Sequence, residues 1–130
     1  MIILTIRTEK PEAEIGLYDG SKQLVYETWH AHRELAETLH GKVEALLKSQ
    51  QLDWPSLQGI VCFQGPGSFT GLRIGLTVAN ALSDSYHLPV IASQDPGWLE
   101  NGIERLLHGE DDKLALPYYG ADAHITLPKK

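Results

Sequence analysis

The first thirty residues carry the apolar and polar pattern of β-strands. Residues 2–6 are an apolar run typical of a buried strand, and apolar residues alternate with small or polar ones through residues 13–20 and 23–30. The sequence DGSK at residues 19–22 is a strong hairpin turn signal. We therefore expect the chain to open with three strands in an antiparallel meander.

Between residues 33 and 50 the apolar period lengthens to that of a helix. Leu35, Leu39, Val43 and Leu46 recur at intervals of three or four residues, and the charged residues occupy other faces. This segment predicts an amphipathic helix with one face turned toward a core.

The rest of the chain alternates short apolar segments with helical patterns. Residues 57–63 and 88–92 predict buried strands, and residues 72–86 and 98–109 predict helices. The resulting order, β-β-β-α-β-α-β-α, favours an α/β fold with a mixed five-stranded sheet and three helices. A ribonuclease-H-like lobe has this order of elements.

The net charge and the lengths of the apolar runs argue against some classes of function. The net charge of −6 offers no basic footprint for nucleic acid, so any RNA chemistry would need another subunit to hold the RNA. No apolar run is long enough to span a bilayer, and we expect a cytoplasmic protein without membrane contact. Cys62 is the single cysteine, within an apolar strand, where a buried thiol is expected.

A glycine-rich turn, QGPGSFTG, joins the strand at 57–63 to the following helix. It is not a P-loop, because Thr70 stands where the second glycine belongs and no lysine follows up to residue 86. Neither G-x-S-x-G nor G-x-G-x-x-G is present. Two interpretations remain: a tight turn capped by Ser68 or Thr70, or an anion site at the helix N-terminus. The residues of that possible anion site are Gly65, Pro66, Gly67, Ser68, Phe69, Thr70, Gly71 and Arg73.

The helix after this loop carries two different stripes. Gly71, Gly75 and Ala79 lie four residues apart and would let another backbone or helix approach closely. We expect a second stripe, formed by Ile74, Val78 and Leu82, to face the sheet. Leu72 and Leu76 would then lie off the core, on a face available to a partner.

The sequence GPGSFTGLRIG resembles the signature of the TsaB (YeaZ) family. The similarity covers residues 1–93, and WLENGIERLLHGEDDKLALPYYG resembles the closing helix and P-x-Y tail of that family. The resemblance implies an actin-like ATPase fold reduced to a single ribonuclease-H-like lobe, with the second lobe missing. It divides the chain into a lobe over residues 1–93 and a closing helix with an extended tail over 94–130, packed on the same lobe.

The family resemblance also implies a function and partners. It implies a non-catalytic subunit that pairs with a TsaD-like subunit, and with a TsaE-like ATPase, in the threonylcarbamoylation of tRNA adenosine next to the anticodon. The tRNA would be contacted only indirectly, and a homodimer could use the same helices. The residues expected at this interface are His32, Leu35, Leu39, Leu72, Gly75, Leu76 and Ala79.

The alternative is an enzyme, either a nucleotide-binding phosphotransferase or a peptidase-like member of the actin-like superfamily. The family has an aspartate in its first strand where this chain has Arg7, and arginine cannot ligate a cation. His32 and His40 are two turns apart, with Ala36 between them, which is too far for one metal. We therefore expect no catalytic residues, no metal and no cofactor.

Overall fold

The computed structural model describes residues 1–31, 35–67 and 69–118. Three antiparallel strands open the chain: β1 (Ile2–Arg7), β2 (Glu12–Asp19) and β3 (Lys22–His30). The predicted hairpin turn joins β2 to β3, and Gly20 within it takes the positive φ of +62° that glycine tolerates. The predicted meander is confirmed.

Two parallel strands complete the sheet. β4 (Gly59–Gly65) pairs with β1, and β5 (Val90–Gln94) pairs with β4, which gives the order β3-β2-β1-β4-β5. Each is preceded by a helix, α1 (Leu35–Ser49) or α2 (Phe69–Tyr86), and a short 3-10 turn, η2 (Trp54–Ser56), precedes β4. The third helix, α3 (Trp98–Leu107), follows β5. This is the single mixed five-stranded lobe that the order of elements predicts.

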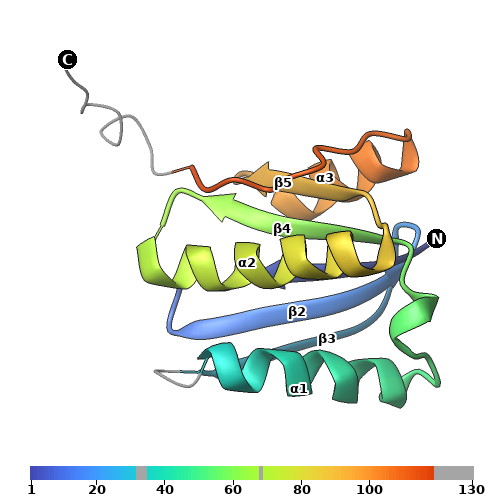
Figure 1. The fold of residues 1–130 in the computed structure, drawn as a ribbon, viewed down its shortest axis with the longest axis horizontal. Coiled ribbons are helices and arrows are strands. Elements are labelled where there is room, and N and C mark those ends of the chain that lie inside the picture. Colours follow the sequence, from blue (N-terminus) through green and yellow to red (C-terminus); the bar gives the residue numbers. More distant parts are fainter. Residues whose placement is uncertain (32–34, 68, 119–130) are drawn as a thin grey trace.

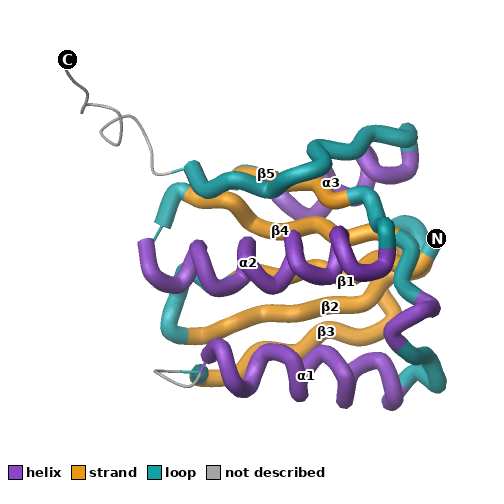
Figure 2. Tube along the Cα trace, viewed as in Figure 1, coloured by secondary structure: helices purple, strands orange, loops and turns teal. Residues whose placement is uncertain are grey.

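The helices form layers on both sides of the sheet. α1 and α2 lie next to each other over one face, while α3 lies behind β4 and β5 (Figures 1 and 2). The alternation of side chains along the strands fixes these faces, because Ile6 points toward Gly75 of α2 and Val61 points toward Gly102 of α3. The core therefore consists of two apolar layers, one on each side of β1 and β4.

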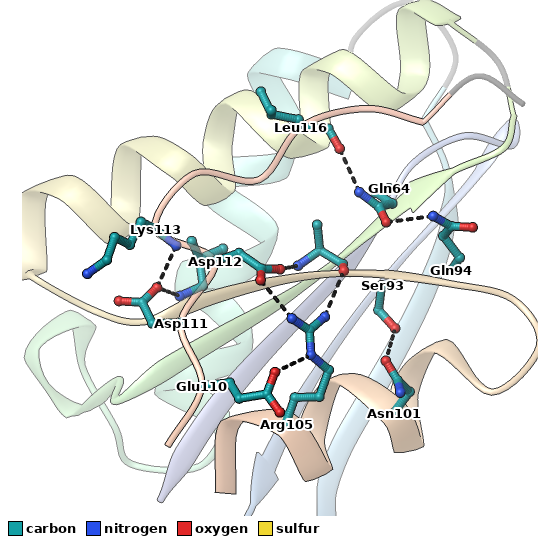
Figure 3. A network of polar contacts seen from close by, with 12 residues as sticks. Gln64, Ser93, Gln94, Asn101, Arg105, Glu110, Asp111, Asp112, Lys113 and Leu116 are labelled. Atoms are coloured by element: carbon teal, nitrogen blue, oxygen red, sulfur yellow. Dashed lines mark hydrogen bonds and ion pairs between the residues drawn. The ribbon is translucent and has the colours of Figure 1, made fainter. Parts of the chain in front are cut away.

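Residues 110–118 run as an extended segment along the edge of β5 (Figure 3). Carboxylate oxygens of Asp111 and Asp112 accept hydrogen bonds from the backbone N–H groups of Val90 and Ala92. Further along, Asn80 of α2 pairs with both the N–H and the carbonyl of Ala115. The two aspartates thereby satisfy edge groups of β5 that a sixth strand would otherwise bond, and Asn80 attaches the segment to α2.

Within the described residues, no helix is both long enough and apolar enough to cross a membrane.

Candidate functional site

The glycine loop follows β4 at the end of the sheet where the parallel strands have their carboxyl ends. In open α/β sheets ligands bind at this end. The α2 helix starts at Phe69, three residues before the predicted start, so Thr70 lies in its first turn and does not cap it. The other predicted cap, Ser68, lies outside the described residues.

The glycines of the loop and of α2 make room for the chain's own backbone. A side chain at Gly71 would collide with the carbonyl oxygen of Thr8, and one at Gly75 with the Thr8 hydroxyl. That hydroxyl donates to the carbonyl oxygen of Gly71 over 2.5 Å. A side chain at Gly67 would collide with Glu9. The small-residue stripe therefore serves close packing against residues 8 and 9, where the sequence interpretation had placed a partner.

The mouth of the loop has neighbours that do not suit an anion. Gly65 has a φ of +120°, and its Cα faces the carbonyl oxygen of Tyr118 so closely that no side chain would fit. Glu9, whose side chain is only 7% exposed, packs against Gly67. Arg73 lines a groove on the outer side of α2, together with Ile74 and other residues. The Tyr118 carbonyl and the Glu9 carboxylate are hydrogen-bond acceptors, whereas a phosphate at this mouth would need donors.

Arg7 occupies the end of β1 at the centre of this sheet edge. Its guanidinium group donates to both carboxylate oxygens of Glu9, the shortest contact being 2.7 Å, and to Asp95 at 2.9 Å. It lies 3.8 Å from the ring centroid of Phe63. Burial lowers the pKa of Arg7, but the hydrogen bonds and charges of Glu9 and Asp95 outweigh this and raise it above its ordinary value. A fixed cation thus neutralises the two carboxylates at the position where the sequence analysis considered a metal.

Cys62 and His40, two side chains that could carry chemistry, are packed against their neighbours. Burial raises the pKa of the Cys62 thiol, in agreement with its predicted place in the core. His40 stacks on Trp54 with ring centroids 4.7 Å apart. Among the described residues no group of three or more histidine, cysteine or acidic side chains is arranged to hold a metal ion. His32, predicted at a partner interface, lies outside the described residues.

The orientation predicted for α2 is wrong. Leu72, Leu76 and Ala79 are at most 3% exposed and belong to the core, together with Gly75, whereas Ile74 and Val78 are only partly buried. Of the stripe predicted to face the sheet, only Leu82 is buried, at 8% exposure. The helix carries apolar residues on two faces, and the face with the glycines is the one that can approach β1 closely. Leu35 and Leu39 of α1 are also in the core. Six of the seven predicted interface residues are therefore buried within this chain.

The opposite face of α2 forms an open groove beside α1, which we call the α1–α2 groove. One hollow of about 340 Å³ is lined by Ala36, Thr70, Arg73, Ile74, Thr77 and Val78. A second, of about 420 Å³, is lined by His40, Trp54, Val78, Ala81, Leu82, Ser85 and Tyr86. Val78 lines both, so the two hollows are neighbours along α2. Sequence reasoning missed this surface because it assigned Ile74 and Val78 to the core.

Comparison with known proteins identifies a family and individual proteins whose sequences are similar to this chain. A model of the TsaD family, described as tRNA N6-adenosine threonylcarbamoyltransferase, matches residues 29–94, about half of the chain. The tRNA threonylcarbamoyladenosine biosynthesis protein TsaB of Escherichia coli is 28% identical, over 92% of this chain and 54% of that protein. The chain thus spans about half the length of the curated relatives that it matches first.

Solved structures similar to this chain include a protein named YeaZ. YeaZ from Pseudomonas aeruginosa superimposes with a TM-score of 0.67 at 26% identity, over 72% of this chain and 44% of that one. T. thermophilus RuvC, in a complex with a Holliday junction substrate, covers 95% of this chain and 87% of its own at a TM-score of 0.53. Its identity of 14% shows a shared fold only. By its family match, its relatives and its fold, the chain belongs to the TsaD family, in the TsaB (YeaZ) branch.

Proposed function

We propose that this chain is a non-catalytic scaffold and activator subunit in the biosynthesis of threonylcarbamoyladenosine in tRNA. The proposal rests on its membership of the TsaB branch, whose relatives are named for this pathway. In it, the chain pairs with a TsaD-like subunit that transfers the threonylcarbamoyl group to the adenosine. The net charge of −6 fits a subunit that leaves tRNA binding to its partner.

The α1–α2 groove is the surface that we assign to this partner. It is the observation that carries the proposal, because Ile74 and Val78 remain partly exposed on the groove side of α2. Leu72, Leu76 and Ala79 of the same helix are buried. Exposed apolar residues in a contiguous groove mark interaction sites. Arg73 lines the same groove and adds positive charge to its rim.

The mass of a mixture with a TsaD-like subunit tests the proposal. Light scattering of the two purified proteins should give a one-to-one complex, and a TsaE-like ATPase should add to that complex. The chain alone should either remain a monomer or form a homodimer that the TsaD-like subunit dissociates, because both would use the same groove. Two folded proteins that do not associate at micromolar concentration would contradict the proposal.

The enzymatic alternative, a nucleotide-binding phosphotransferase or a peptidase-like enzyme, has less support. The Arg7–Glu9–Asp95 ion pairs hold an arginine where a nucleotide's metal would need free carboxylates. Calorimetric titration with ATP and magnesium separates the two functions. Heat with micromolar affinity would favour the enzyme, whereas the scaffold proposal expects none.

A further inference from the structure

One side of α3 carries a second apolar stripe, which runs from the core to the surface on the face of the sheet opposite to α1 and α2. Leu99, Ile103 and Leu107 follow one another at intervals of four residues, so they line up along the helix. Tyr18 of β2 forms the facing wall of a groove of about 320 Å³. Leu107 remains 48% exposed, whereas Ile103, at 5%, forms the floor.

Two carboxylates follow this stripe along its edge. Glu100 and Glu104 are exposed, line the same groove and are also four residues apart. Across the described part of the chain neither carboxylate has an ion-pair partner, whereas neighbouring Arg105 is held by Glu110 and Asp112. Burial raises the pKa of Tyr18, and the nearby charge of Glu100 raises it further. The groove is therefore apolar at its floor and negative along its edge.

We propose that this α3 groove docks a basic amphipathic helix of a protein partner. The groove is lined by Tyr18, Ser21, Leu99, Glu100, Ile103, Glu104, Leu107 and His108. A helix packed along α3 would place its own apolar ridge between Leu99 and Leu107. Lysine or arginine residues four apart on that helix would then face Glu100 and Glu104. An acidic helix would meet two like charges and would bind more weakly.

The position of the groove gives it a use beyond the proposed pairing with a TsaD-like subunit. α3 lies on the face of the sheet opposite to α1 and α2 (Figure 1), whose residues line the α1–α2 groove. A helix in the α3 groove would therefore leave the α1–α2 groove open, and one chain could hold two partners at once. This inference does not depend on the identity of the partner at the first groove.

Fluorescence anisotropy with a model peptide tests the inference on the full chain. The probe is a labelled amphipathic helix of about sixteen residues, built from leucine and lysine, and its counterpart carries glutamate in place of lysine. The leucine–lysine helix should bind with a Kd on the order of micromolar, and the leucine–glutamate helix should bind more weakly. The double variant Glu100→Gln/Glu104→Gln should weaken binding roughly tenfold.

A matched variant separates the groove from general charge attraction. Glu37→Gln/Glu44→Gln removes the same charge from α1, on the other face of the sheet, and should leave the affinity unchanged. Leu107→Ala, at a half-exposed position, should also weaken binding while the melting temperature stays within a few degrees. Equal losses in the two glutamate variants, or an affinity that neither the α3 glutamates nor Leu107 alter, would overturn the proposal.

Discussion

The Thr8 carbonyl oxygen occupies the space where a side chain of Gly71 would begin, and the Thr8 hydroxyl donates to the Gly71 carbonyl. The end of β1 is thereby held against the first turns of α2. The glycines of the family signature consequently have a role inside the chain, since they set how closely the helix approaches the sheet. The surface that we propose for a partner lies on the other side of α2.

Gly71→Ala should destabilise the protein by about 1–3 kcal/mol, because its Cβ would collide with backbone atoms that cannot turn aside. Gly41→Ala is the matched control: it lies in α1, and a Cβ there would meet no atom within 4 Å. That substitution should stabilise the protein by about 0.5–1 kcal/mol through helix propensity. Urea denaturation measures both, and a Gly71→Ala protein as stable as Gly41→Ala would contradict the packing described.

Replacement of Arg7 should leave Glu9 as a nearly buried charge without its partner. Arg7→Met should lower the free energy of unfolding at neutral pH by about 2–3 kcal/mol, and Arg7→Met/Glu9→Gln should recover part of that loss. Lys48→Met breaks an exposed ion pair with Glu44 and should change stability by less than about 0.5 kcal/mol. If the two single variants lose the same stability in urea denaturation, the Arg7 ion pairs do not hold the sheet edge.

The buried hydroxyl of Tyr26 should make the folded protein lose stability as the pH rises into the alkaline range. Burial raises the pKa of Tyr26, and the hydrogen bond of its hydroxyl to Glu14, at 2.6 Å, raises it further. Above pH 10, the ordinary value, the unfolded chain loses this proton while the folded chain keeps it, so stability falls as the pH rises. Between pH 9.5 and roughly 11.5, Tyr26→Phe should show a shallower fall than the wild type. Parallel curves for the two proteins in alkaline denaturation would refute this assignment.

A charge in the α1–α2 groove should prevent pairing with a TsaD-like subunit. Val78→Glu places a carboxylate between the two hollows and should weaken the complex at least a hundredfold, because the charge would be buried at the interface. Leu116→Glu makes the same kind of change at a 58% exposed position outside the groove and should have no effect. Light scattering and calorimetry of both variants provide the measurement; equal complexes would move the interface elsewhere.

Asn80 should control how firmly residues 114–118 are attached. Asn80→Ala removes both bonds to Ala115, at 2.8 and 2.9 Å, and should accelerate hydrogen exchange of the Ala115 amide at least tenfold. Asn80→Asp keeps the acceptor for the Ala115 N–H and should have a smaller effect. Amides of β1 serve as the internal reference. Unchanged exchange at Ala115 in both variants would show that other contacts hold the segment.

The apolar pattern of the sequence was sufficient to predict the order of elements. The meander, the helix beginning near Leu35 and the buried strand around Cys62 were all predicted, because periods of two and of 3.6 reflect which backbone geometry buries the apolar side chains. The signature GPGSFTGLRIG also pointed to the correct family before any geometry was known. Short stretches of the sequence are thus enough to predict the order of the elements and the family.

Only the tertiary structure decided which face of α2 is buried. The helix has apolar residues on two faces, one with Leu72 and Leu76 and the other with Ile74 and Val78. Periodicity alone could not show which of these faces is buried. The contact between Gly71 and Thr8, 63 residues apart, settled the matter, since the helix packs closest where it has no side chains. The ion pair of Arg7 also depends on a distant residue, because its partner Asp95 is 88 residues away. Contacts between residues so far apart in the sequence depend on how the whole sheet is assembled, and no local pattern encodes them.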